Sequence, residues 1–193
     1  MVLKKQVGFF GGTFDPIHFG HINLALEMVE LCGLDEVLFC PAFCSPFKMA
    51  TPPIAEAKDR LEMVRLGIEG VPRCKVSAIE VERQGPSFTI DTIRALYRED
   101  PKVQYRLILG EEAMHDLDHW KEAQELLRLA PPIFGARRSA SAERNHRVTA
   151  IRRIDISSTD IRTRISLGLY CGHLVPEQVL AYIAEKHLYT QRD

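Results

Sequence analysis

The sequence predicts an α/β fold in which helices cover both faces of one doubly wound parallel sheet. Short apolar runs alternate with amphipathic segments along the 193 residues. Strands that alternate with helices form parallel sheets, because each helix returns the chain to the same edge of the sheet. The composition, 46% hydrophobic and 26% charged, is typical of a globular protein. We expect residues 1–193 to form a single domain that ends in helices.

The core of this fold is expected to contain five strands and four helices in alternation. The strands are the short apolar runs 7–10, 36–40, 74–79, 104–109 and 132–136. The helices are the segments with apolar residues at helical spacing: 18–32, 54–69, 88–99 and 120–129. The apolar stripe of the second helix leaves Arg60 on its exposed side. Ser87 or Thr89 is the expected N-cap of the third helix.

The C-terminal part is expected to add a short strand and two helices: 148–156, 158–167 and 176–187. Gly168 is placed to cap the first of these helices, and Pro176 to begin the second. Two loops, the proline-containing 41–53 and the polar, basic 137–147, are expected to form the edges of a site.

The net charge, the length of the apolar stretches and the cysteine content exclude several classes of function. The net charge of −1 provides no field for non-specific nucleic-acid binding. No apolar stretch is long enough for a signal peptide or a membrane span, so we expect a cytoplasmic protein with no membrane partner. Five cysteines without a C-x-x-C pair are expected to be packed thiols, neither disulfides nor zinc ligands, and no metal-ligating set is predicted. The composition leaves a homo-oligomer open.

The segment 7–21 carries the strongest chemical signal. It reads Val-Gly-Phe-Phe-Gly-Gly-Thr-Phe-Asp-Pro-Ile-His-Phe-Gly-His. Gly11 and Gly12 follow a strand and allow backbone N–H groups to approach a ligand, and the segment lacks the G-x-G-x-x-G fingerprint of dinucleotide-binding proteins. His18 and His21 fall on one face of a helix start, where unpaired N–H groups and the helix dipole favour anions. Asp15 either shapes the turn before the proline or contacts a substrate.

A second helix start of the same kind follows at residues 156–162, Ile-Ser-Ser-Thr-Asp-Ile-Arg. Ser157 and Asp160 suggest a capped helix, and Arg162 places a guanidinium in its first turn. Gly20, between the histidines, would allow a base or a phosphate to lie against the first helix. Two phosphate-type helix starts in one small domain predict a polyphosphate ligand.

Together these motifs resemble the nucleotidyltransferase superfamily that shares the H-x-G-H signature. The Gly-Gly-Thr-Phe-Asp-Pro form, with Ser-Phe-Thr-Ile-Asp-Thr at 87–92, is similar to the bacterial nicotinate mononucleotide adenylyltransferases, and the resemblance runs nearly end to end. It implies a Rossmann-like fold and transfer of AMP from ATP to nicotinate mononucleotide, giving nicotinate adenine dinucleotide and pyrophosphate in NAD biosynthesis. Mg²⁺ would accompany the ATP phosphates.

The resemblance also implies roles for individual residues. The expected catalytic residues are His18, His21, Lys48 and Arg162. The expected ATP-binding residues are Gly11, Gly12, Thr13, Phe14, Gly20, Gly110, Glu112, Arg138, Ser157, Ser158 and Thr159. The expected nicotinate-binding residues are Thr89, Trp120 and Lys121, with the indole stacking on the pyridine ring.

The sequence departs from the family's pattern in four places. Phe47 replaces a histidine before Lys48, and Glu112 stands where aspartate is usual. Lys121 follows Trp120 where tyrosine is common. In the Arg-Arg-Ser stretch at 137–139, Arg138 is preferred as the equivalent of the family's arginine. Alternative functions are transfer to nicotinamide mononucleotide, phosphopantetheine or glycerol phosphate, and a non-catalytic nucleotide sensor on the same fold.

Overall fold

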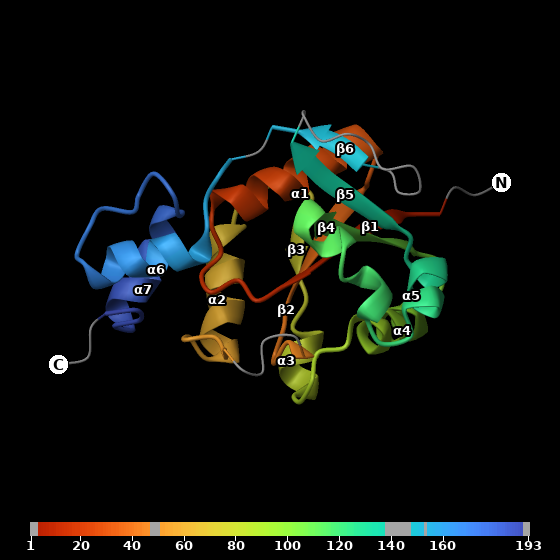
Figure 1. Cartoon of the computed structure of the whole chain (residues 1–193), viewed down its shortest axis with the longest axis horizontal. Helices are drawn as coiled ribbons and strands as arrows, with labels where there is room; N and C mark the ends of the chain where they lie inside the picture. The colour runs from red at the N-terminus through yellow and green to blue at the C-terminus, as the bar shows by residue number, and fades with distance from the viewer. Residues whose placement is uncertain (1–3, 47–50, 138–147, 153, 191–193) are drawn as a thin grey trace.

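The computed structural model describes residues 4–46, 51–137, 148–152 and 154–190, and these form one sheet covered by helices. Six parallel strands lie in the order β3-β2-β1-β4-β5-β6. Their bounds are β1 Gln6–Gly12, β2 Glu36–Pro41, β3 Cys74–Val76, β4 Gln104–Gly110, β5 Pro132–Arg137 and β6 Val148–Ile151. The doubly wound parallel sheet predicted from the sequence is confirmed (Figure 1).

Helices cover both faces of the sheet. Their bounds are α1 Phe19–Cys32, α2 Ala57–Gly67, α3 Ile79–Arg83, α4 Thr89–Glu99, α5 Ala123–Leu129, α6 Ser158–Ser166 and α7 Glu177–Glu185. Helices α1 and α2 pack on one face, with α7 against α2, while α4 and α5 pack on the other (Figure 1). Two short 3₁₀ helices, Glu111–Met114 and Leu117–His119, connect β4 to α5.

The alternation of side chains along the strands separates two hydrophobic cores. In β1, Phe9 enters the core under α4 and α5, whereas Phe10 enters the core under α1 and α2. In β4, Leu107 enters the core under α4 and α5, and Ile108 enters the core under α1 and α2. Both faces of each central strand are therefore buried, which explains the nearly continuous apolar runs in the sequence.

Some boundaries differ from those predicted. The strand expected over 74–79 ends at Val76, because Ile79 begins α3, a short helix that buries Glu80 at 4% exposure. Helix α5 begins at residue 123, not 120, because Glu122 adopts a left-handed conformation with φ 51°. Strand β6 ends at Ile151, five residues before the predicted end at 156.

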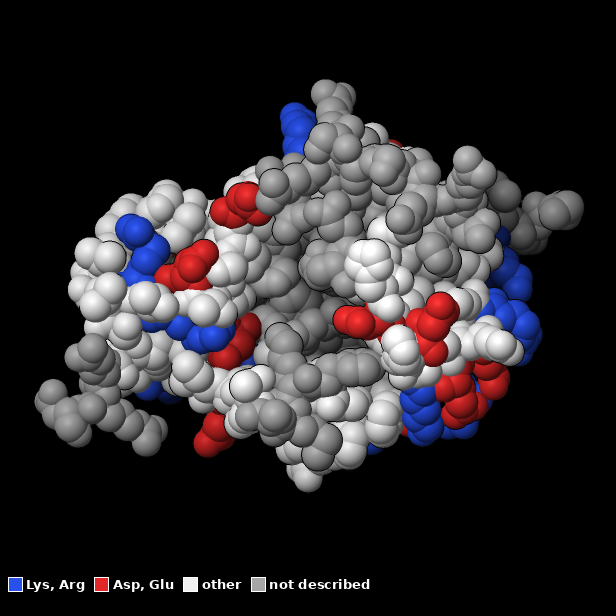
Figure 2. Space-filling view, viewed as in Figure 1, with Lys and Arg blue, Asp and Glu red and all other residues white. Residues whose placement is uncertain are grey.

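The connections place a switch in strand order at the centre of the sheet. From β1 the chain moves outward through β2 and β3, and it then returns to β4 on the other side of β1. The carboxyl ends of β1 and β4 form the crevice where ligands bind in open parallel sheets. On the face seen in Figure 2, side chains of both charges are interspersed over α6–α7 and α4–α5, and the surface is hollowed between them. Within the described residues, no helix is long and apolar enough to cross a membrane.

Candidate active site

Two cavities open where the central strands end. The larger, of about 790 Å³, lies between the starts of α1 and α6 and the ends of β4 and β5. The smaller, of about 260 Å³, lies between the ends of β1 and β4, the start of α4 and residues 120–121. Thr13, directly after β1, lines both. The site is therefore a pair of adjoining cavities at the switch point of the sheet.

Gly11 and Gly12 keep the end of β1 free of side chains. A Cβ at Gly11 would lie 3.0 Å from the ring of Phe9, and one at Gly12 would lie 2.8 Å from the ring of Phe14. Phe14 is buried with φ 50°, and its ring contacts His21 edge-on at a centroid distance of 5.0 Å. Both glycines line the smaller cavity. Their lack of side chains thus makes room for aromatic packing as well as for a ligand.

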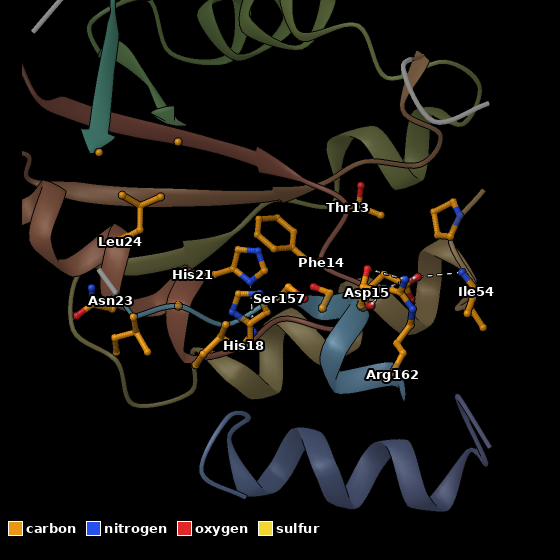
Figure 3. Close-up of a pocket in the computed structure, with 18 of the residues that line it drawn as sticks. Thr13, Phe14, Asp15, His18, His21, Asn23, Leu24, Ile54, Ser157 and Arg162 are labelled. Atoms are coloured by element: carbon orange, nitrogen blue, oxygen red, sulfur yellow. Dashed lines mark hydrogen bonds and ion pairs between the residues drawn. The ribbon is translucent and has the colours of Figure 1, made fainter. Parts of the chain in front are cut away.

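His18 and His21 lie one above the other at the start of α1 (Figure 3). Their ring centroids are 3.7 Å apart and the ring planes differ by 24°, so the predicted placement on one face is confirmed. The backbone N–H of His18 donates to Nδ1 of His21 at 3.3 Å. An Nδ1 that accepts carries no hydrogen, so the hydrogen of the neutral His21 ring lies on Nε2. Both side chains line the larger cavity.

Burial keeps His18 neutral. The residue is 5% exposed, and desolvation lowers its pKa from 6.5 to about 4. Within the described residues its Nδ1 has no hydrogen-bond partner. A Cβ at Gly20 would lie 3.0 Å from the His18 ring and 3.3 Å from the carbonyl oxygen of Ile154. A side chain at position 20 would therefore crowd both the His18 ring and the Ile154 carbonyl, and glycine avoids this.

The start of α6 closes the other side of the larger cavity. The Ser157 hydroxyl accepts from the backbone N–H of Asp160 at 3.0 Å, which confirms the predicted cap. The Ser158 hydroxyl donates to the carbonyl of Pro16 at 2.9 Å. Arg162 donates to the carbonyl of Asp15 at 2.8 Å and to the Thr159 hydroxyl at 3.2 Å. These contacts bring the two predicted helix starts together on one cavity.

The Asp15 carboxylate is held by the protein itself. It accepts from the backbone N–H groups of Ile54 and Ala55 at 2.9 and 3.1 Å and from the Tyr189 hydroxyl at 2.6 Å. Arg162 lies 3.8 Å away as an ion pair (Figure 3). Of the two roles left open for Asp15, these contacts favour shaping the turn. Tyr189 was not predicted here, because no sequence pattern links a C-terminal tyrosine to this turn.

The smaller cavity contains the three residues that the resemblance assigned to nicotinate. Thr89 lies at the start of α4, and Trp120 and Lys121 lie opposite, after the second 3₁₀ helix. The Lys121 ammonium pairs with Asp91 at 2.9 Å and lies 4.7 Å above the centroid of the Phe88 ring. Lys121 therefore bridges the two walls at the mouth of the cavity.

The predicted cap of α4 is wrong. The N-cap is Phe88, with no side-chain cap bond. Ser87 instead accepts from the backbone N–H of Phe43 at 2.9 Å and joins the loop after β2 to the α4 start. Beneath it the Thr92 hydroxyl donates to Glu80 at 2.7 Å, and burial raises the pKa of that carboxyl. Within the described residues, the first-turn N–H groups of α4 thus have no side-chain cap.

The remaining predicted residues fall into three groups. Thr13 and Phe14 line the larger cavity, as does Gly110 at the end of β4. Glu112 lies in the 3₁₀ helix that follows Gly110. Lys48 and Arg138 lie outside the described residues, so their predicted roles stay predictions.

Sequence reasoning missed the apolar end of the larger cavity. Asn23 and Leu24, one turn into α1, lie at the opposite end of the site from Arg162 (Figure 3). Ile151 and Ile154 continue this wall. The helical spacing of α1 gave no signal for Leu24, because a cavity-lining leucine has the same pattern as a core leucine.

The predicted exposure of Arg60 in α2 is wrong. The sequence placed it on the exposed side of its helix, but it is 1% exposed. Its guanidinium donates to four backbone carbonyls from the loops after β1 and β2 and from the turn before α2. Helical periodicity treats arginine as polar and therefore as exposed, and only tertiary packing brings the carbonyls together.

In the part of the chain that the structure describes, no group of three or more His, Cys, Asp or Glu side chains is placed to hold a metal ion. The larger cavity offers imidazoles, hydroxyls and a guanidinium. These groups suit phosphate oxygens, and a hard divalent cation would be held mainly by the phosphates themselves and by water.

The family model of cytidylyltransferase-like proteins matches residues 9–164, which include β1 to α6 and both helix starts. The chain belongs to the cytidylyltransferase-like family. Relatives named probable nicotinate-nucleotide adenylyltransferase match almost the whole chain. That of Herpetosiphon aurantiacus is 37% identical, with 96% of this chain and 98% of the relative covered. That of Dehalococcoides mccartyi is 38% identical, with 99% and 100% covered.

Solved structures of nicotinic acid mononucleotide adenylyltransferases have the same fold as this chain. The nicotinic acid mononucleotide adenylyltransferase of Plasmodium falciparum complexed with NaAD has a TM-score of 0.78 at 18% identity, with 96% of this chain and 97% of that chain covered. Its complex with APC has a TM-score of 0.76. At this identity the similarity concerns the fold, and the assignment of each side chain depends on the geometry described above.

Proposed function

We propose that this protein transfers AMP from ATP to nicotinate mononucleotide, forming nicotinate adenine dinucleotide and pyrophosphate in NAD biosynthesis. The observation that carries the proposal is the pair of cavities that adjoin at Thr13. One is large and flanked by two helix starts, and the other is small, with an indole on its wall. Relatives of the same length bear the name of this activity, and a structure of the same fold was solved with the product NaAD.

In the larger cavity we place ATP. The adenosine would lie against the apolar end formed by Leu24, Ile151 and Ile154, with its ribose near Gly110. The triphosphate would lie at the polar end, where the α6 start offers backbone N–H groups and Arg162. His18 and His21 lie between these ends and would contact the α- and β-phosphates.

The reaction needs positioning and charge stabilisation, with no covalent intermediate on the protein. An oxygen of the mononucleotide's 5′-phosphate attacks the α-phosphorus of ATP, and a new P–O bond forms there. The bond between the α-phosphorus and the bridging oxygen breaks, and its electron pair leaves with pyrophosphate. The Nε2 hydrogen of His21 would donate to phosphate oxygens whose charge grows in this step. Lys48 is proposed as a further cation.

In the smaller cavity we place the nicotinate ring. Trp120 would stack on the pyridine, and the uncapped N–H groups at the start of α4 would bind the carboxylate. Thr89 and Lys121 would supply further donors at the same end. This arrangement orients the 5′-phosphate of the mononucleotide towards Thr13 and the neighbouring larger cavity.

A divalent metal, which we propose to be Mg²⁺, would enter with the ATP phosphates and supply charge neutralisation on the leaving pyrophosphate. The imidazoles and Arg162 would donate to phosphate oxygens beside it. We further propose that the protein acts in the cytoplasm on these two small molecules.

The test is turnover of the purified chain with ATP and nicotinate mononucleotide, followed by chromatography of the dinucleotide and by pyrophosphate release. Nicotinamide mononucleotide, phosphopantetheine and glycerol 3-phosphate are measured in parallel. Stoichiometric nicotinate adenine dinucleotide and pyrophosphate support the proposal. Preference for another acceptor would replace it, and ATP binding without turnover of any acceptor would indicate a nucleotide sensor.

A further inference from the structure

Arg60 lies in a buried position where its guanidinium, among the described residues, meets only backbone oxygen atoms at hydrogen-bond distance. Nη1 donates to the carbonyls of Thr13 and Ala42, each at 2.7 Å. Nη2 donates to Phe43 at 3.0 Å, and Nε donates to Ala55 at 3.1 Å. Burying a cation costs free energy. The hydrogen bonds to four carbonyl oxygens offset that cost, because each carbonyl directs its negative end towards the guanidinium. A core position filled for packing alone would take an apolar side chain.

The four carbonyls belong to three segments that wall the two cavities. Thr13 lines both cavities, and Ala42 lines the smaller one. Ala55 directly follows the segment 51–54, which lines the larger one. One side chain therefore connects the backbone segments that line the two cavities, close to Thr13, where the cavities adjoin.

The shape of arginine suits this task. The guanidinium presents five N–H groups in one rigid plane, and four of them are used here, whereas a lysine ammonium has three donors. The three segments lie far apart in the sequence, so a shift of any one would change the spacing between the cavities. None of these four hydrogen bonds goes to the other walls of the cavities, at α1, α6 and α4.

We propose that Arg60 is a positioning residue that fixes the distance between the two substrate cavities. This inference rests on the proposed function. Loss of the guanidinium should leave each substrate bound but misplace the attacking phosphate relative to the α-phosphorus. A misplacement of about 1 Å costs about 10²-fold in rate. The effect should therefore appear in kcat, with the KM of each substrate changed about threefold or less.

The experiment compares the wild-type chain with Arg60→Lys, Arg60→Met and Arg65→Met. Arg65 is a matched control on the same helix, because its side chain is 51% exposed and pairs only with Glu62 at the surface among the contacts described. Thermal unfolding and circular dichroism establish that each variant is folded. We then measure kcat and both KM values with ATP and nicotinate mononucleotide.

The expected result is a kcat lowered about 30-fold or more in Arg60→Lys and further in Arg60→Met, with nearly constant KM values and a normal Arg65→Met. A folded Arg60 variant with kcat within threefold of the wild type would overturn the inference. Raised KM values at unchanged kcat would overturn it too, because Arg60 would then shape each cavity separately. If neither Arg60 variant folds, Arg60 is a core residue and the inference is rejected. Absence of turnover in the wild type and in Arg65→Met would instead reject the proposed function.

Discussion

The imidazole rings of His18 and His21 stack at 3.7 Å in the first turn of α1, and the pKa of His18 is lowered to about 4. Two protonated rings at this distance would repel each other, so the stack disfavours protonation of both rings at once. A neutral pair can still donate hydrogen bonds to phosphate. The helix start then supplies the positive potential, and the imidazoles supply directed donors.

The first prediction follows from the pKa of His18. In the unfolded chain His18 takes up a proton near pH 6.5, whereas in the folded protein it does so near pH 4. Its contribution to stability is therefore present above pH 6.5 and is lost as the pH falls towards 4. Each unit of pKa shift corresponds to about 1.4 kcal/mol, so a few kcal/mol are at stake.

Urea unfolding of the wild type and of His18→Asn at pH 7 and pH 4.5 measures this contribution. The wild type should lose more stability on acidification than His18→Asn does, and the difference isolates His18 from the other titrating groups. Equal losses would show that the His18 pKa is close to its ordinary value.

The second prediction concerns catalysis. His21→Ala should leave the fold intact and lower turnover by about 10²-fold, because one preorganised donor to a developing charge is lost. His18→Ala should behave similarly. The control is His173→Ala, since His173 is exposed and stacks on Tyr170 in the loop between α6 and α7. Near-normal turnover of His21→Ala at saturating ATP would remove His21 from the mechanism.

Much of this site could be predicted from local patterns. The helix starts at His18 and Ser157 are encoded by residues that lie within one turn of each other, so the sequence alone placed both. The parallel sheet followed from alternating apolar runs, because each strand between two helix layers is buried on both faces.

What could not be predicted depends on contacts between distant segments. Arg60 is buried because carbonyls from residues 13, 42, 43 and 55 converge on it, and Tyr189 reaches Asp15 from the opposite end of the chain. Ser87 was expected to cap a helix, but its hydroxyl instead accepts a hydrogen bond from a backbone N–H in the loop after β2. In each case a polar side chain finds a partner in a distant segment, and only the fold brings the two together.

A third prediction concerns the acid and amide forms of the mononucleotide. The N–H donors at the start of α4 should prefer a carboxylate, because an amide is a weaker acceptor and brings its own donors against them. The kcat/KM for nicotinate mononucleotide should exceed that for nicotinamide mononucleotide by about 10-fold or more, an energy of about 1.4 kcal/mol. Comparable values of kcat/KM would indicate a dual-specificity enzyme.

A fourth prediction tests the contact between Tyr189 and Asp15. Tyr189 is 6% exposed and donates to the carboxylate at 2.6 Å, so Tyr189→Phe keeps the packing but removes a charge-assisted hydrogen bond. The free energy of unfolding should fall by about 1.5–3 kcal/mol. Tyr182→Phe is the control, because Tyr182 donates to the less buried Asp59 at 2.8 Å and should cost less. Equal losses in urea titrations would contradict this ranking.

The last prediction separates the two substrates through Trp120, which lines the smaller cavity and also packs partly against the core beneath α4 and α5. Stacking of a base on an aromatic side chain contributes about 1–3 kcal/mol. Trp120→Ala should therefore raise the KM for nicotinate mononucleotide about 10-fold or more and leave the KM for ATP nearly unchanged, because ATP is held in the other cavity. Trp120→Phe keeps an aromatic face and should recover most of the loss. Titration of each substrate, with circular dichroism on the same samples, decides between the two roles of Trp120. Equally weakened binding of both substrates, or an unfolded Trp120→Ala, would make Trp120 a core residue and leave the pyridine ring without its stacking partner.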